Sequence, residues 1–139
     1  FFVSGDTMVV QGDKVLVVRR KHNPSEGMLA LAGGYINQDE TLEKCALREL
    51  VEETQIEVPM DVLLENIVFT RMFDDPKRSE RGRIITGCVL IDLPESLGDI
   101  AVTASDDAEE AFWMNLEDVS PMDFFEDHAF IIRTMETFR

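Results

Sequence analysis

Basic residues are scarce in this chain, and their scarcity restricts the partners that the protein can bind. Only 13 of the 139 residues are Lys or Arg, against 28 Asp or Glu, so the formal net charge is −15. Nonspecific binding to nucleic acids requires basic patches, and anionic membranes attract basic surfaces for the same reason. The composition therefore predicts no nucleic-acid partner and no membrane partner. A small phosphorylated substrate remains compatible with it, provided that metal ions and local arginines offset the charge.

Long apolar runs and cysteines are also lacking. No apolar run is long enough to span a membrane, and the chain carries no signal peptide. Cys45 and Cys88 lack metal-ligand spacing, and two isolated thiols in a chain of this size favour a reducing cytoplasm. The length fits one domain, residues 1–139. Because the chain begins with Phe1 rather than Met, we expect it to be the C-terminal part of a longer protein.

Several signatures of common enzyme classes are missing as well. The chain contains no Ser-His-Asp signature, no phosphate-binding loop ending in Lys-Ser or Lys-Thr, and no dinucleotide fingerprint. What it does contain is an interleaved series of strand and helix patterns. Two β-rich runs, 7–11 and 14–19, flank Gly12-Asp13 and predict a hairpin. Helices are predicted over 41–53 and 124–138.

Further strands are expected over residues 28–32, 62–73, 84–93 and 111–114. Charged loops are expected at 74–82 and 94–107, and a loop with breaker residues at 22–27. Strands and helices interleave here without strict alternation. The sequence therefore predicts an α/β fold with a mixed sheet and helices on both of its faces.

The helix predicted over residues 41–53 carries three glutamates where helix stability disfavours them. Glu49, Glu52 and Glu53 fall at i, i+3 and i+4, which places them on one face, and each like-charged pair costs roughly 0.2–0.5 kcal/mol. The last two also lie in the final turn, where the helix dipole favours cations. A bound divalent cation would remove this conflict, because Mg²⁺ and Mn²⁺ prefer hard carboxylate oxygens. A solvated acidic surface is the alternative interpretation.

The spacing around these glutamates resembles the signature box of the Nudix hydrolase family. Gly34 is followed after five residues by Glu40, after seven more by Arg48-Glu49-Leu50, and after one more by Glu52-Glu53. The departure is Gln55, where the family has a glycine that ends the helix in a left-handed conformation. Glutamine adopts that conformation at a cost on the order of 1 kcal/mol. The resemblance implies the Nudix fold, a mixed β sheet sandwiched between α helices.

The resemblance also implies a chemistry and a set of residues for it. Family members hydrolyse a nucleoside diphosphate linked to another group, by attack of water on phosphorus, with Mg²⁺ or Mn²⁺ as cofactor. It implies Glu52 and Glu53 as the central metal ligands, completed by Glu49 and by a carbonyl of the glycine loop. We expect Arg48 to orient these glutamates in an ion pair with Glu40. The implied catalytic residues are Arg48, Glu49, Glu52 and Glu53, and the implied metal ligands are Gly34, Glu49, Glu52 and Glu53.

The general base remains open between two sources. In relatives it is either a glutamate of the box or an acid from a separate loop. The acidic loop before Phe112-Trp113 matches that second source in position. A solvated loop is the alternative. The candidate acids are Asp106, Asp107 and Glu110, with Glu109 beside them.

Outside the box the chain resembles the ADP-ribose-acting Nudix group, and most of all the Nudix domain of bifunctional nicotinamide mononucleotide adenylyltransferase/ADP-ribose pyrophosphatases. Residues carrying this resemblance include Arg81-Gly82-Arg83, Asp106-Asp107 and 125–128. It implies hydrolysis of ADP-ribose to AMP and ribose 5-phosphate by a homodimer. The planar fork of arginine suits phosphate oxygens, and aromatic rings could stack on adenine or belong to the core. The candidate substrate-binding residues are Arg19, Arg71, Phe73, Arg81 and Arg83, with Arg20 and Phe112 as further possibilities.

Two other functions compete with this one. The first is a Nudix hydrolase of another substrate, such as NADH, an oxidised nucleotide or a nucleotide sugar. The second is a noncatalytic Nudix-like domain that senses ADP-ribose within a transcription regulator. Such sensors usually lose the metal-binding glutamates, all of which are present here, and the chain lacks a DNA-binding helix-turn-helix.

Overall fold

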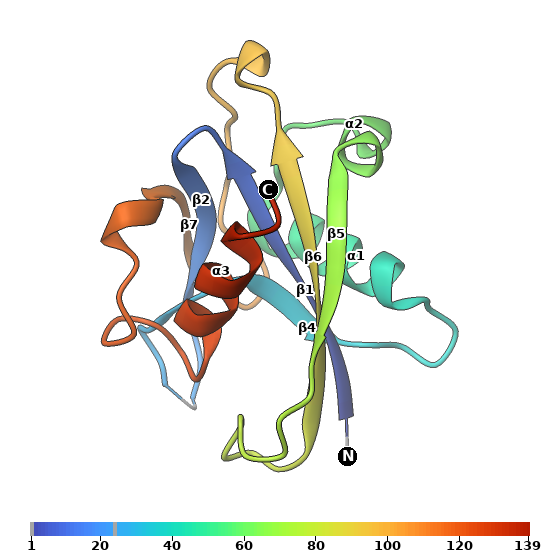
Figure 1. The fold of residues 1–139 in the computed structure, drawn as a ribbon, viewed down its shortest axis with the longest axis vertical. Helices are drawn as coiled ribbons and strands as arrows, with labels where there is room; N and C mark the ends of the chain where they lie inside the picture. The colour runs from blue at the N-terminus through green and yellow to red at the C-terminus, as the bar shows by residue number, and fades with distance from the viewer. Residues whose placement is uncertain (1, 24) are drawn as a thin grey trace.

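The computed structural model describes residues 2–23 and 25–139, and a seven-stranded sheet forms its centre (Figure 1). The strands are β1 (Phe2–Gln11), β2 (Lys14–Arg20), β3 (Leu29–Ala30), β4 (Ala32–Tyr35), β5 (Ile67–Phe73), β6 (Ile84–Leu93) and β7 (Ala108–Asn115). The helices are α1 (Leu42–Thr54), α2 (Met60–Glu65) and α3 (His128–Glu136), with two short 3-10 turns at Glu95–Leu97 and Leu116–Asp118. The strands run in the order β3-β2-β1-β6-β5, and β4 and β7 pair with β1 and β2.

The sheet is mixed, as its sequence pattern predicted. β1 and β6 pair in parallel from Phe2–Ile84 to Gln11–Leu93, and the other strand pairs are antiparallel. Alternation along β1 divides the core between the two faces, since successive side chains of a strand point in opposite directions. Val9 packs in the cluster that contains Ala46, Leu47 and Leu50 of α1, whereas Met8 and Val10 pack in the cluster that contains Ile131, Ile132 and Met135 of α3. The predicted sheet between helices is confirmed, with α3 and α1 on opposite faces (Figure 1).

The predicted strand over residues 62–73 is wrong in its first part. Residues 60–65 form α2, and β5 begins only at Ile67. Pro59 stands at the helix start, where a missing N–H costs nothing, and the Asn66 side chain bonds the Val62 carbonyl at the other end. Only Leu63 of α2 is buried, so the apolar run reflects one helix turn followed by a strand.

Other boundaries also differ from prediction, since β1 begins at Phe2 rather than at residue 7 and β7 spans Ala108–Asn115 rather than 111–114. The apolar run at 28–32 divides into β3 and β4, and β4 continues through Gly33-Gly34 to Tyr35. The C-terminal helix begins at His128 rather than at residue 124. Phe124 instead makes a parallel bridge to Leu29, and Glu126 has a φ of 45°, which no right-handed helix accommodates.

The predicted ends of α1 are confirmed. The Thr41 hydroxyl accepts a hydrogen bond from the Lys44 N–H at the start, which satisfies one of the unpaired amides there. Gln55 closes the helix in the left-handed conformation, at φ 44° and ψ 41°, and its N–H bonds the Val51 carbonyl. The Gly12-Asp13 hairpin is confirmed as well, with Gln11 opposite Lys14. Within the described residues, no helix is long and apolar enough to cross a membrane.

Candidate active site

The second half of α1 lies directly against β4, and two glycines permit this contact. A Cβ added at Gly34 would lie 2.5 Å from the carboxyl carbon of Glu49, and one added at Gly33 would collide with the Asp6 carboxylate. The Gly33 N–H donates to Oε1 of Glu53 at 2.8 Å. Since any side chain at either glycine would push away a carboxylate, both positions favour glycine through close approach.

Three carboxylates converge beside this contact. Oxygens of Glu49, Glu52 and Asp106 all lie within 4.8 Å of one another. Glu49 and Glu52 share one face of α1, as their spacing predicted, whereas Asp106 arrives from the acidic loop with a φ of 57°. Oxygen donors from a rigid helix and a loop fit a hard divalent cation such as Mg²⁺ or Mn²⁺.

The surroundings of the glutamates disfavour their negative charge. Burial is the main reason why the pKa of Glu49 lies above its ordinary value, with Arg48 acting in the opposite direction. Glu53 is more deeply buried, and burial raises its pKa to about 8 despite the hydrogen bond from Gly33. A nearby cation favours the ionised form of a carboxyl group. The electrostatics therefore agree with the donor geometry in favouring a cation at this position.

Arg48 connects the carboxylates of this region. It forms a bidentate pair with Glu40, at 2.6 and 2.9 Å, which confirms the expected ion pair. Its Nη1 donates to Glu49 at 2.9 Å and to Glu52 at 3.2 Å. The Arg48 hydrogen bond lowers the pKa of Glu40 to about 2. Arg48 thus holds two of the three converging carboxylates from within the helix.

A cavity of about 270 Å³ opens next to the carboxylates. Gly34, Glu53 and Asp107 line it. Gly34 lies against Glu49, while Glu53 and Asp107 directly follow Glu52 and Asp106 in the sequence. Its cationic lining consists of Arg20, Lys21, Arg78 and Arg81. In a chain with a net charge of −15, this concentration of positive charge marks a site for an anion.

Two arginines share one aromatic ring in the cavity. The Arg20 guanidinium carbon lies 3.9 Å from the centroid of Phe125, and that of Arg81 lies 5.0 Å from it. Arg81 also donates to the Tyr35 hydroxyl at 3.2 Å and pairs with Glu126 at 3.0 Å. Burial, followed by the charge of Arg81, lowers the pKa of Arg20. An anionic ligand between the two guanidinium groups would relieve their repulsion.

The inner end of the cavity contains a buried histidine and a buried aspartate. Nδ1 of His128 accepts a hydrogen bond from the Leu31 N–H at 3.0 Å, so a neutral ring carries its proton on Nε2, which lies 3.6 Å from Asp6 Oδ2. Burial lowers the pKa of His128 to about 3 and raises that of Asp6 to about 7. The histidine is therefore neutral near pH 7 and bonds the backbone between β3 and β4, which favours a structural role for it.

The structure separates the predicted substrate residues into two groups. Among the residues that it describes, Arg81 and Arg20 line the cavity, but Arg19, Arg71, Phe73 and Arg83 do not. Phe73 is buried in the core below the Arg71 guanidinium. Arg83 donates to the Asp74 carbonyl at 2.6 Å.

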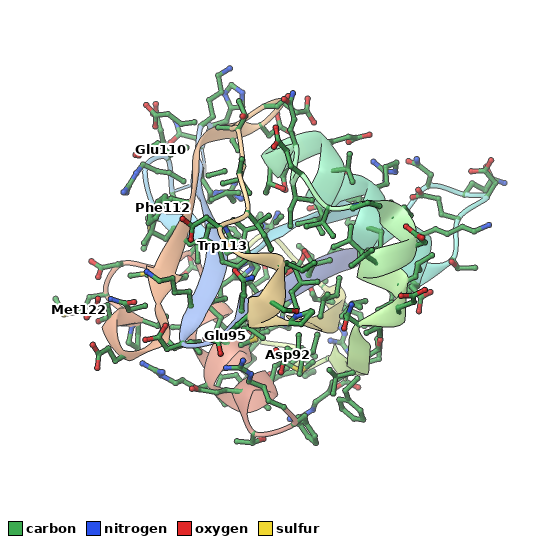
Figure 2. All side chains as sticks on the ribbon, turned by 90° about the horizontal axis from the view of Figure 1, so that it is seen from above. Asp92, Glu95, Glu110, Phe112, Trp113 and Met122 are labelled. Carbon is green, nitrogen blue, oxygen red and sulfur yellow. The ribbon has the colours of Figure 1, made fainter. Side chains whose placement is uncertain are left out.

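Arg19 belongs to a different groove, on the β7 side of the molecule. It pairs with Glu110 at 2.6 Å, and its guanidinium carbon lies 5.9 Å from the centroid of Phe112. Figure 2 shows Glu110 and Phe112 together on this side, with Met122 at the rim. Of the candidate loop acids, Asp106 therefore joins the carboxylates and Asp107 the cavity, whereas Glu110 neutralises an arginine elsewhere.

Sequence reasoning did not select three of the residues that form the cavity. Asp6 lies just before the strand predicted over 7–11, Arg78 lies in a charged loop, and Phe125 lies beside other aromatics. Asp6 gave no signal, because only the structure extends β1 to Phe2 and so buries this carboxylate. Arg78 gave no signal either, because exposed loops carry most arginines.

We expect Mg²⁺ or Mn²⁺ to raise the thermal midpoint of the protein. The carboxylates of Glu49, Glu52 and Asp106 repel one another in the folded state, and a ligand that binds only this state stabilises it by roughly 2.7 kcal/mol at a hundred times its Kd. Differential scanning fluorimetry with and without EDTA would measure the shift. An unchanged midpoint with both cations would contradict a preformed metal site. Asp106→Asn should reduce the shift, whereas Asp99→Asn in the same loop should not.

Comparisons with known proteins agree with this arrangement. The NUDIX domain family matches residues 3–135. The ADP-ribose pyrophosphatase of Methanocaldococcus jannaschii is 32% identical over 131 residues, which cover 94% of this chain and 70% of that protein. A bifunctional NMN adenylyltransferase/ADP ribose pyrophosphatase from Francisella tularensis, solved with AMP and a manganese ion, superposes with a TM-score of 0.92 at 32% identity. That comparison covers 99% of this chain but only 42% of the Francisella protein.

Another solved NUDIX domain shares the fold as well. The NUDIX domain of Shewanella oneidensis NrtR, solved with ADP ribose, superposes with a TM-score of 0.79 at 26% identity, over 98% of this chain and 86% of that domain. The family match thus extends over nearly the whole chain. On these grounds the chain belongs to the Nudix family.

Proposed function

We propose that this protein hydrolyses the diphosphate linkage of ADP-ribose, giving AMP and ribose 5-phosphate, with Mg²⁺ or Mn²⁺ as cofactor. The observation that carries the proposal is the position of the arginine-lined cavity immediately beside the carboxylates of α1. An acidic protein needs both features to bind and cleave an anionic diphosphate. Both bifunctional and single-function relatives named for ADP-ribose hydrolysis support this substrate.

One group of residues would bind the cation, and a second group would bind the substrate. Glu49, Glu52 and Asp106 would hold the divalent cation, with Glu53 and the Gly34 carbonyl beside them. When bound, such cations neutralise a diphosphate and lower the pKa of an attacking water. Arg48 keeps Glu49 and Glu52 in place, because a guanidinium that bonds both of them and is itself fixed by Glu40 limits their rotation.

Arg81 and Arg20 would bind the phosphate oxygens of the substrate. Both guanidinium groups lie over Phe125 in the cavity, where a charge-assisted bidentate contact to phosphate is possible. Asp107 lines the same cavity and is the loop acid that we propose accepts a proton from water, since Asp106 is assigned to the cation. Water adds to one phosphorus, the bridging P–O bond breaks, and the proton passes to the acceptor. We infer a general base from this loop rather than from Glu110.

Two further expectations belong to the proposal. We infer a cytoplasmic protein, since Cys45 and Cys88 are both free and buried, with pKa values raised by burial. We also infer a homodimer without a nucleic-acid partner. The exposed apolar side chains of the edge strand β5, namely Val68, Phe69 and Met72, offer a surface for association. Analytical ultracentrifugation would test the oligomeric state.

The test of the activity is a hydrolysis screen with Mg²⁺ in which the products are resolved by chromatography. We expect ADP-ribose to be cleaved with a higher kcat/KM than NADH, a nucleotide sugar or an oxidised nucleoside triphosphate, and AMP to appear with ribose 5-phosphate. A preference for one of the other compounds would assign a different Nudix activity. Binding of ADP-ribose without cleavage would indicate a sensor, the function that the NrtR domain suggests, although that class usually lacks the intact glutamates found here.

A further inference from the structure

Arg78 is a cation of the cavity lining whose guanidinium is extensively hydrogen-bonded. Its side chain is only 4% exposed. Nε and Nη2 form a fork with the Asp127 carboxylate at 2.9 and 2.8 Å, while Nη1 donates to the Thr86 hydroxyl at 2.8 Å and to the Ile84 carbonyl at 3.2 Å. These bonds join the loop at 74–83 to β6 and to the residue preceding α3. They use four of the five N–H groups of the guanidinium, so Arg78 retains little capacity to bind a phosphate itself.

Arg81 lies three residues further along the same loop and makes a parallel connection. It pairs with Glu126, the neighbour of Asp127, at 3.0 Å, and its side chain is 31% exposed. Ser79 lies between the two arginines in sequence, and its hydroxyl bonds Glu126 at 2.6 Å and accepts from the Arg81 N–H at 3.2 Å. Arg81 lines the cavity and its side chain is more exposed than that of Arg78, but its position depends on Glu126, Tyr35 and the anchoring of the loop.

The anchoring comes from few residues. Of residues 74–82, Ser79 is buried, Arg78 is partly buried, and the remaining residues are exposed. The segment on the other side is held in an unfavourable backbone conformation, since Glu126 has a φ of 45°. Such conformations persist only where surrounding contacts fix them, and they occur most often at functional sites. The fork between Arg78, whose side chain is only 4% exposed, and Asp127 joins both segments, as does the bond between Ser79 and Glu126.

We propose that Arg78 is a positioning residue, which acts on substrate binding by holding the Arg81 guanidinium at the cavity through its fork with Asp127. This proposal rests on the proposed function, because it assigns to Arg81 the contact with the anionic substrate. Arg78 lines the same cavity, so the rival interpretation is a direct contact between Arg78 and substrate. The two interpretations differ in what happens once Arg81 is absent.

The test is a double-mutant cycle with Arg78→Lys and Arg81→Ala. Lysine keeps the charge but cannot form the fork, so we expect Arg78→Lys to raise the KM for ADP-ribose about ten-fold and to change kcat much less. In the Arg81→Ala background the same substitution should leave KM nearly unchanged, because there is no guanidinium left to position. Asp127→Asn, which breaks the fork from the other side, should reproduce the KM increase. Lys77→Ala removes a charge from the same exposed loop and is the matched control, expected to have no effect.

The outcomes separate this proposal from the proposed function. If Arg78→Lys raises KM equally with and without Arg81, Arg78 acts directly on substrate or through the fold. If Arg78→Lys leaves KM unchanged when Arg81 is present, Arg78 positions nothing. Either result overturns the proposal. The thermal shift with Mg²⁺ must persist in each variant, which excludes general misfolding. If the wild type fails to cleave ADP-ribose but binds it, the cycle is measured by calorimetric Kd instead. If it neither cleaves nor binds ADP-ribose, the proposed function fails and this inference fails with it.

Discussion

Glu53→Gln is expected to lower kcat for ADP-ribose by about a hundred-fold or more while changing KM far less. Metal-assisted stabilisation of a transition state is worth several kcal/mol, and each 1.36 kcal/mol corresponds to a factor of ten in rate. The amide oxygen of glutamine can still accept the Gly33 N–H, so the contact between α1 and β4 survives while the carboxylate charge is lost. Steady-state kinetics at saturating Mg²⁺ would measure the effect, and Glu52→Gln should behave in the same way.

The matched control for this experiment is Glu43→Gln. Glu43 is an exposed glutamate in the first turn of the same helix, and it lies outside the carboxylate cluster. Its substitution removes one negative charge from α1 without touching the proposed cation site, so kcat should be unchanged. If Glu53→Gln and Glu52→Gln turn over substrate nearly as fast as the wild type at saturating Mg²⁺, the assignment of the metal ligands is wrong.

The second large effect concerns two arginines that stand two residues apart. Arg81→Ala should lower kcat/KM for ADP-ribose by about ten-fold or more, since loss of one charge-assisted contact costs about 1.5–3 kcal/mol. Arg83→Ala should lower it clearly less, because Arg83 bonds the Asp74 carbonyl and does not line the cavity. Both variants should keep the thermal shift with Mg²⁺, since neither residue belongs to α1. Kinetics with purified variants would provide the comparison.

If Arg83→Ala lowered kcat/KM more than Arg81→Ala, the substrate-binding surface would have to be assigned to the outer side of the loop. If both variants hydrolyse ADP-ribose as well as the wild type, the arginine assignment fails while the metal assignment survives. This separation is possible because the cation cluster and the arginines come from different elements. The cluster depends on α1 and the acidic loop, whereas Arg81 depends on the loop at 74–83 and on Glu126.

Local periodicity predicted two of the converging carboxylates, whereas Glu53, predicted on the same face, lies outside the cluster and bonds the Gly33 N–H. Glu49 and Glu52 meet because an α-helix places residues i and i+3 on one face whatever the rest of the chain does. The Arg48–Glu40 pair and the left-handed Gln55 likewise lie within sixteen residues of one another, and all were predicted correctly. The interleaving of strands and helices without strict alternation also predicted the sheet between helices, since each element must bury its apolar face against another layer.

The set of residues that line the cavity depends on tertiary structure alone. Asp6, Arg78 and His128 are far apart in the chain, and only the parallel pairing of β1 with β6 and the docking of α3 bring them to one place. The pairing of β2 with β7 sends Arg19 towards Glu110, on the other side from Arg20, since alternate residues of a strand face opposite ways. Asp106 reaches the glutamates because the backbone of its loop bonds the end of α1, through Thr103 to Thr54 and Ser105 to Glu53. Sequence alone thus determined the helix that presents the carboxylates, whereas the third carboxylate and the arginines around the substrate cavity depend on contacts between segments that no local pattern relates.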